Sequence, residues 1–263
     1  MKRIASIALA AVSMAAWAPA AGAADDDKSL IPESWVPGKF SANVGVVSEY
    51  IFRGLSQTDD TPALQGGFDW NLESIAGSPV GLYAGFWGSN VDFKTGNHLE
   101  TDWYAGLQGN IAPIDTTWKL GGLYYLYPRA PTGSNQSYGE LTSLLSHDFG
   151  LAAFTVGFNY SPDFFGGSGD AEYLSFKLDI PIWKFTLSPI AGRQWIEKNA
   201  VFGVPDYWHY GAALTTKIVG FDATVAVSDT NIRDSKCNVV GGVAALPTDP
   251  CGPQVTFMLS RTF

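Results

Sequence analysis

The chain has 263 residues, of which only 16 % are charged, while 14 % are aromatic and 29 are glycines. An average soluble domain has about a quarter of its residues charged, so this composition favours strands joined by turns. The formal net charge of −9 and the lack of any basic run after the first residues argue against a nucleic-acid partner, because that binding depends on clustered Lys and Arg.

The first 23 residues have the organisation of a secretory signal peptide. A basic start (Lys2-Arg3) precedes an apolar stretch over residues 4–17, and Ala21-Gly22-Ala23 forms a small-residue cleavage site. The apolar stretch is shorter than the ~20 residues that a spanning helix needs. We therefore expect cleavage after Ala23 and a short periplasmic segment over residues 24–39.

The rest of the chain, residues 40–263, repeats an alternation of apolar and polar residues in segments of roughly ten residues, as in transmembrane strands. These segments lie near 40–53, 62–73, 79–91, 99–112, 116–128, 138–149, 151–162, 170–182, 184–197, 206–219, 220–233 and 253–263. Past the signal no run of 18 apolar residues occurs, so a membrane would be crossed by strands of a closed barrel. The sequence predicts an all-β fold, a transmembrane antiparallel up-and-down β-barrel of about 12 strands in the outer membrane.

The connections distinguish this barrel from a soluble β-sandwich, which would show the same alternation of side chains. Short connections and longer ones follow each other in turn, as expected where tight turns lie on the periplasmic side and long loops outside. The short ones lie at 112–115, 149–150, 181–183 and 219–220, and longer ones at 54–61, 92–98, 129–137, 163–169, 198–205 and 234–252.

Aromatic residues cluster near the segment ends, where they predict two girdles at the membrane surfaces. Ordinary core aromatics are the alternative. The residues concerned are Tyr50, Phe52, Trp118, Tyr124, Tyr125, Tyr127, Trp183, Tyr207, Trp208 and Tyr210.

The last segment alternates Val255, Phe257 and Leu259 on one face and ends on Phe263. A terminal strand ending in an aromatic residue resembles the signal that the barrel-assembly machinery recognises, although Arg261 interrupts the apolar face. We therefore expect that machinery as a partner, through Phe263.

Several stretches resemble the TorF-type family of proteobacterial porins, among them residues 41–57, 82–92 and 160–166, with 48–57 the most specific. The resemblance implies an outer-membrane barrel in contact with lipid and lipopolysaccharide that passes small solutes or ions. It implies no cofactor and no established site residue. The sequence leaves the oligomeric state open between monomer and trimer.

The polar face of the alternation predicts the residues that line the lumen. They are Glu49, Arg53, Asp69, Glu73, Glu100, Asp102, Lys119, Glu140, Lys177, Asp179, Lys217 and Asp222. Carboxylates outnumber cations in this set, and charged rings set pore selectivity, so the sequence predicts passive diffusion through a narrow, weakly cation-selective lumen. The alternative is that these charges pair across strands and fill the lumen. Glu49 and Arg53 are expected on one face of the first strand.

Cys237 and Cys251 predict a disulfide, since an exported chain folds in an oxidising compartment. The loop they close is apolar over residues 239–246, which suggests a plug or lid and, as an alternative function, a structural or surface-interaction barrel.

An outer-membrane hydrolase is the remaining alternative. It would need a base among His98, His147 and His209, and His147 lies near Ser143, Ser146 and Asp148 in sequence. Neighbouring residues of a strand face opposite sides, which separates His147 from Ser146 and Asp148. We therefore expect no enzymatic activity, no catalytic residues and no metal site.

Overall fold

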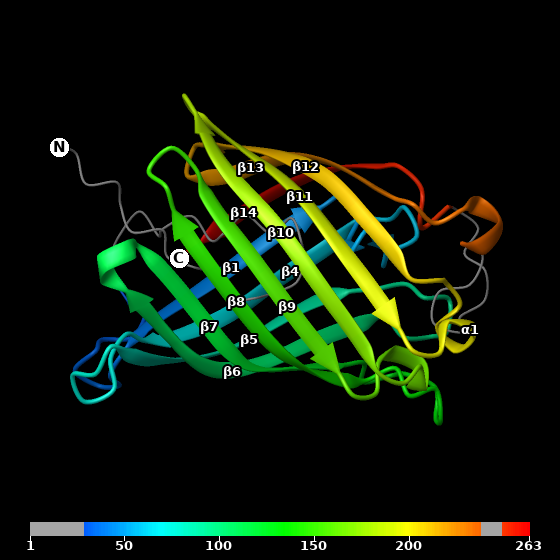
Figure 1. Ribbon diagram of the computed structural model, residues 1–263, viewed down its shortest axis with the longest axis horizontal. Helices are drawn as coiled ribbons and strands as arrows, with labels where there is room; N and C mark the ends of the chain where they lie inside the picture. Colours follow the sequence, from blue (N-terminus) through cyan, green and yellow to red (C-terminus); the bar gives the residue numbers. More distant parts are fainter. Residues whose placement is uncertain (1–28, 238–248) are drawn as a thin grey trace.

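The computed structural model describes residues 29–237 and 249–263 (Figure 1). The predicted signal peptide (1–23) and the apolar part of the disulfide loop (239–246) lie outside the described residues. Twelve strands form the barrel: β1 (Lys39–Val47), β4 (Ala63–Leu72), β5 (Val80–Asn90), β6 (Leu99–Ile111), β7 (Thr116–Leu126), β8 (Tyr138–Asp148), β9 (Ala153–Ser161), β10 (Ala171–Ile182), β11 (Phe185–Ile196), β12 (Tyr207–Ile218), β13 (Phe221–Thr230) and β14 (Gln254–Thr262).

The shorter elements all lie in the connections between these strands. They are the hairpin strands β2 (Ile51–Phe52) and β3 (Leu55–Ser56), the single helical turns η1 (Ala112–Ile114), η2 (Phe165–Gly167) and η3 (Asp234–Lys236), and the helix α1 (Asn199–Phe202). Within residues 29–237 and 249–263, no helix has the length and apolar character that crossing a membrane requires.

The barrel is antiparallel and closed, with each strand paired to its neighbour in sequence and β1 paired to both β4 and β14. Closure satisfies the backbone groups that an open sheet would leave at its two edges. The predicted all-β barrel of twelve strands is confirmed.

The two faces of each strand differ as the alternation predicts. In β6, Trp103 and Leu107 are 55 % and 41 % exposed on the outside, whereas Glu100, Asp102 and Tyr104 are buried inside. Successive side chains of a strand point to opposite faces, so one sequence supplies both an apolar outer surface and a polar interior.

The two ends of the barrel differ in their connections. At one end, which also holds the start of β1 and the end of β14, β10–β11 and β12–β13 are joined by two-residue turns, with Trp183, Val219 and Gly220 at positive φ (Figure 1). We call it the short-turn end. The connections β4–β5, β6–β7 (with η1) and β8–β9 lie at this end too, whereas those that contain the hairpin of β2 and β3, η2, α1 and η3 lie at the opposite, long-loop end.

The first predicted strand, 40–53, is wrong in its second half. β1 ends at Val47, and the chain then forms the short hairpin of β2 and β3. Arg53 and Gly54, with φ of 48° and 82°, close its turn. Leu55 of the hairpin and Tyr50 just before it are 2 % exposed, which shows that the hairpin packs inside the barrel. Arg53 is therefore not on the first strand, and neither is Glu49.

The predicted aromatic girdles are partly wrong. Tyr124, Trp183, Trp208 and Tyr210 are exposed on the outside, as expected for a girdle. Trp118 is half-buried on the same outward face of β7 as Leu120 and Tyr124. The remaining five face the interior: Tyr50, Tyr125, Tyr127 and Tyr207 are at most 5 % exposed, and Phe52 packs against the same cluster.

Candidate functional site in the barrel lumen

The hairpin of β2 and β3 crosses the lumen and contacts the far wall through Arg53. Its guanidinium Nη2 lies 2.7 Å from both carboxylate oxygens of Glu140 on β8, and Nη1 donates to Oε1 of Gln194 on β11 at 2.7 Å. In the ring of strands, β8 to β11 lie opposite β1 and β4, from which the hairpin emerges. The tip of the hairpin is thus bonded to the opposite side of the barrel.

Aromatic rings enclose the same guanidinium. Its central carbon lies 4.1 Å from the ring centre of Tyr173, 4.8 Å from that of Phe52 and 5.8 Å from that of Phe164. A guanidinium over an aromatic face is attracted by the ring's negative charge distribution, most strongly when water is excluded. Arg53 itself is 1 % exposed, so these contacts replace its hydration.

Glu140 is held by the wall as well as by Arg53. Its Oε2 accepts hydrogen bonds from the Tyr125 hydroxyl at 3.3 Å and from Nδ2 of Asn159 at 3.0 Å. A buried carboxylate needs such donors because losing water without replacement costs several kcal/mol.

Two further carboxylates, those of Glu100 and Asp102, lie on β6. Glu100 accepts hydrogen bonds from the hydroxyls of Tyr50 at 2.7 Å and Tyr127 at 2.5 Å, which ties the hairpin to this wall too. Two positions further along the same face, Asp102 is 1 % exposed, and its Oδ1 is buried with no hydrogen-bond partner among the described residues. Acidic side chains are therefore gathered around the docked hairpin.

Gly54 fixes the depth of the hairpin. A Cβ at this position would lie 2.5 Å from Cβ of His209 and 2.8 Å from Cγ2 of Thr230, on β12 and β13. His209 in turn is hydrogen-bonded to the Tyr173 hydroxyl at 2.8 Å. Only glycine lets the hairpin tip approach this closely with a positive φ.

The half of the lumen toward the short-turn end holds separate polar groups. The Tyr104 hydroxyl donates to Asp69 at 2.7 Å, and the Lys119 ammonium lies 4.8 Å from the ring centre of Tyr83. Across the barrel, Lys177 pairs with Asp179 at 3.0 Å.

The structure places the other predicted lumen residues apart from this network. Glu73 follows β4 at the short-turn end, where its exposed carboxylate lies 3.4 Å from the Lys39 ammonium. Lys217 is exposed near the same end, and Asp222 beside it is 9 % exposed. Glu49 lies in the loop before the hairpin and is 6 % exposed. Burial raises the pKa of Glu49, and a hydrogen bond with Ser56 opposes this rise.

The sequence prediction did not include the neutral residues that complete the network, chiefly Tyr173, Gln194 and Asn159. All three lie on inward-facing positions of alternating strands, so the alternation could have identified them as lumen residues. Their joint contact with Arg53 and Glu140 could not be predicted from the sequence, because it depends on how the hairpin folds.

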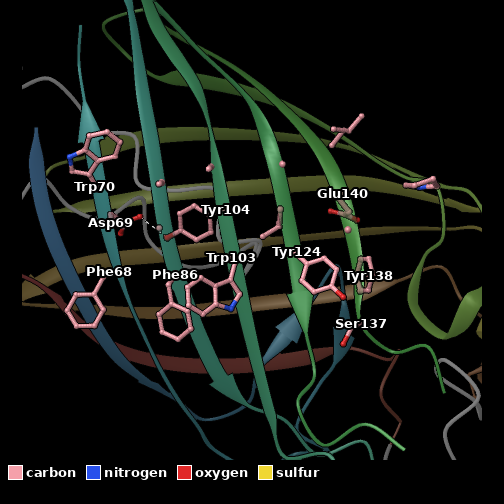
Figure 2. Close-up of a pocket in the computed structure, with 18 of the residues that line it drawn as sticks. Phe68, Asp69, Trp70, Phe86, Trp103, Tyr104, Tyr124, Ser137, Tyr138 and Glu140 are labelled. Carbon is pink, nitrogen blue, oxygen red and sulfur yellow. Dashed lines mark hydrogen bonds between the residues drawn. The ribbon is translucent and has the colours of Figure 1, made fainter. Parts of the chain in front are cut away.

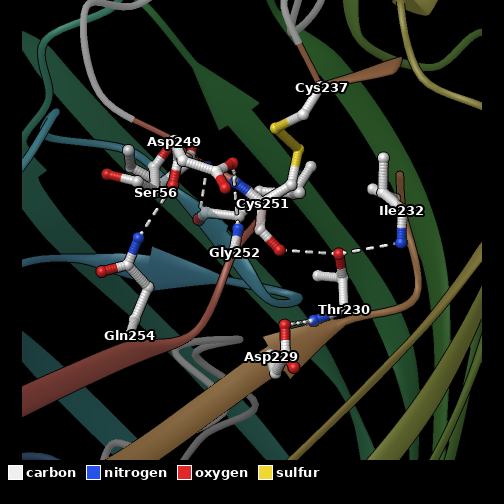
Figure 3. Close-up of a disulfide and its surroundings, with 11 residues drawn as sticks. Ser56, Asp229, Thr230, Ile232, Cys237, Asp249, Cys251, Gly252 and Gln254 are labelled. Carbon is white, nitrogen blue, oxygen red and sulfur yellow. Dashed lines mark hydrogen bonds between the residues drawn. A yellow bond between two sulfur atoms is a disulfide. The ribbon is translucent and has the colours of Figure 1, made fainter. Parts of the chain in front are cut away.

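The predicted disulfide between Cys237 and Cys251 is present, with the Cα atoms 5.9 Å apart (Figure 3). The Thr230 hydroxyl at the end of β13 donates to the Cys251 carbonyl at 2.7 Å. The Ser56 amide of the hairpin donates to the Pro250 carbonyl at 2.9 Å. The disulfide segment is therefore bonded directly to the hairpin.

Two of the three histidines considered for hydrolysis have other partners. His147 is hydrogen-bonded to the Thr116 hydroxyl at 2.8 Å, and His209 to Tyr173. Ser146 pairs with Thr155 at 2.9 Å, and Ser143 donates to the Phe158 carbonyl at 3.3 Å. These contacts do not place a serine beside a histidine base.

The family profile that matches residues 32–263 is described as a bacterial protein of unknown function. The chain belongs to this Gcw_chp family. No curated protein matches the sequence.

Two solved structures illustrate the likeness in fold. An outer membrane channel from Pseudomonas putida F1 is similar with a TM-score of 0.50 and 10 % identity, over 86 % of this chain and 96 % of that one. A NanC porin is similar with a TM-score of 0.49 and 10 % identity, over 85 % and 98 %. At this identity the likeness concerns the fold alone.

The outer surface of this Gcw_chp protein carries a groove of about 1060 Å³ over β4 to β8 (Figure 2). Phe68, Trp103 and Tyr124 lie along it, 64 %, 55 % and 47 % exposed, and Ala105 and Gly122 leave space between them. Asp69, Tyr104 and Glu140 of the same strands also line it, although their side chains make the lumen contacts described above.

Proposed function

We propose that this protein is an outer-membrane porin, through whose narrow lumen small solutes or ions diffuse with a weak preference for cations. The apolar outer face and the closed ring of strands support a barrel in the outer membrane. The fold shared with an outer membrane channel supports the same assignment. The TorF-type resemblance, export by a signal peptide, assembly through Phe263 and contact with lipopolysaccharide belong to this proposal.

The observation that carries the proposal is the hairpin across the lumen, held by Arg53 on the far wall. A barrel of twelve strands lies between small barrels filled by side chains and the wide porins of 16 or more strands. An inserted segment in such a lumen sets its width. We therefore assign the pore's constriction to the hairpin.

Cation preference follows from the charges beside the hairpin. Glu100 and Asp102 on β6 face the interior, and Asp69 lies further toward the short-turn end. Arg53 is bonded to Glu140, so its charge is already matched there. An excess of carboxylates along the path attracts cations.

The test is single-channel current from the refolded mature chain in planar bilayers under a salt gradient. We expect small ohmic steps whose reversal potential lies on the cation side, and the Asp102→Asn variant should move that potential toward zero. Replacing residues 50–58 by a Gly-Ser linker should enlarge the steps. A folded barrel that stays silent with the linker as well would overturn the porin proposal and favour a structural barrel.

A further inference from the structure

The wall of the barrel forms a pocket for one guanidinium group, and the chain's own Arg53 occupies it. The pocket comes from three strands: Glu140 on β8, Tyr173 on β10 and Gln194 on β11, each at most 4 % exposed. A planar guanidinium offers its donors in a fixed fork, and here one edge meets the carboxylate while a second nitrogen meets the amide oxygen. The Tyr173 ring covers one face of the plane.

The wall orients this pocket through contacts that do not involve Arg53. The Gln194 amide nitrogen donates to the carbonyls of Glu172 at 3.0 Å and Trp195 at 3.1 Å, which turns its oxygen toward the guanidinium. Asn159 and Tyr125 hold Glu140 in the same way. A pocket whose groups are already oriented loses little freedom on binding.

The element that brings Arg53 to the pocket is weak by comparison. β2 and β3 pair through only two residues each. Arg53 itself has φ of 48°, in the left-handed region that is strained for a non-glycine residue. An isolated two-stranded hairpin is marginally stable in water, so its docking depends on the contacts of its side chains with the wall and on the backbone hydrogen bond from Ser56 to Pro250.

We propose that this wall pocket is a binding subsite for the guanidinium group of a small solute, and that Arg53 fills it while the hairpin is docked. The inference rests on the proposed function, since the solute must enter the lumen. A guanidinium solute then competes with Arg53 and shifts the hairpin away from the far wall. An alkylammonium solute fits less well. Its compact charge lacks the planar, forked donors with which a guanidinium meets the carboxylate and the amide oxygen together.

The first test uses the refolded mature chain in detergent and the Arg53→Ala variant, with guanidinium chloride at millimolar concentration and sodium chloride as the matched salt. We expect guanidinium to raise the melting temperature of Arg53→Ala in a saturable way. In the wild type the rise should be much smaller and need higher concentrations, because guanidinium must there displace Arg53. The double variant R53A/E140Q should bind guanidinium about tenfold more weakly, because it loses a hydrogen bond to a charged acceptor.

The matched control is Arg193→Ala. Arg193 also stacks on aromatic rings, those of Trp195 and Trp208, but on the outside of the barrel. Its removal should create no guanidinium response. Equal responses of Arg53→Ala and Arg193→Ala, or none in either, would overturn the proposal. If Arg53→Ala does not refold alone, its refolding yield becomes the readout: recovery with guanidinium but not sodium supports the pocket, and no recovery refutes it.

The second test separates the pocket from the pore. In planar bilayers, guanidinium should raise the wild-type current beyond the effect of sodium at the same ionic strength. If guanidinium binds to Arg53→Ala but neither the wild type nor the variant conducts current, the binding pocket is supported and the porin function is refuted. If the protein conducts current but guanidinium changes neither its melting temperature nor its conductance, the binding pocket is refuted and the porin function is supported.

Discussion

Arg53 and Glu140 form a buried ion pair across the lumen, with guanidinium Nη2 2.7 Å from the carboxylate and both side chains 2 % exposed. The partners are 87 residues apart in sequence. Arg53 belongs to the hairpin and Glu140 to the wall, so the ion pair forms only when the hairpin is docked.

Removing one partner of this pair should cost more stability than removing both. Glu140→Gln leaves the Arg53 charge buried without its carboxylate, and loss of one partner from a buried pair costs about 3–5 kcal/mol. The double variant R53A/E140Q should regain part of that free energy of unfolding, measured in urea after refolding into vesicles. A double variant that is destabilised by the sum of the two single changes would show that the residues do not interact.

Gly54→Ala should loosen the hairpin, because the added Cβ would meet His209 and Thr230 closer than 3 Å. We expect larger current steps and faster proteolysis between β1 and β4. Gly96→Ala is the matched control: Gly96 has φ of +84°, close to the +82° of Gly54, with nothing within 4 Å of the added Cβ. If the two variants behave alike, the positive φ and not the contact explains the effect.

The strands could be predicted from the sequence and the hairpin could not, for a physical reason. Alternation in a segment such as 99–112 fixes which side chains face out of the barrel, because a register shift of one residue would move the whole apolar set to the other face. Tyr50 and Phe52 continue that alternation past Val47, so the sequence around them has the pattern of a longer strand.

What turns the chain inward is packing against distant residues. Phe52 lies 5.7 Å from Tyr125 ring to ring, Tyr50 lies 5.6 Å from Trp87, and Arg53 reaches Glu140. None of these pairs is close in sequence. The lumen charges on the strands follow from alternation, whereas their grouping around one arginine follows from the tertiary fold.

Breaking the disulfide should also release the hairpin. Cys251→Ser removes the link to Cys237 next to Pro250, whose carbonyl accepts from the Ser56 amide of the hairpin. Closing a loop of 14 residues contributes roughly 3 kcal/mol. We expect higher or noisier current in Cys251→Ser, and the same change in the wild type after reduction. Unchanged current in both would show that the segment does not act on the lumen.

The docking of the hairpin should depend on pH through Glu49. Burial, with the nearby charge of Asp60, raises the pKa of Glu49 above that of a free glutamate carboxyl, so the docked form favours the protonated carboxyl. This stabilisation is complete below the unfolded pKa and is lost as pH rises through the raised value. Hydrogen-exchange protection of residues 48–62, corrected for the intrinsic pH dependence of amide exchange, should therefore rise at acid pH in the wild type. Glu49→Gln, neutral throughout, should show a flatter pH dependence, and an identical dependence would contradict the assignment.

Charge on the outer face should destabilise the barrel only when that face meets lipid. Leu120 lies near the middle of β7 and is 55 % exposed on the outside. In a bilayer, Leu120→Arg should lower the free energy of unfolding by about 2–4 kcal/mol relative to Leu120→Ala, since a cation near the midplane of the membrane loses its hydration. In detergent micelles, where water reaches the surface more easily, the difference should shrink. Equal stability of the two variants in vesicles would contradict a membrane-spanning barrel, because water would then surround this face.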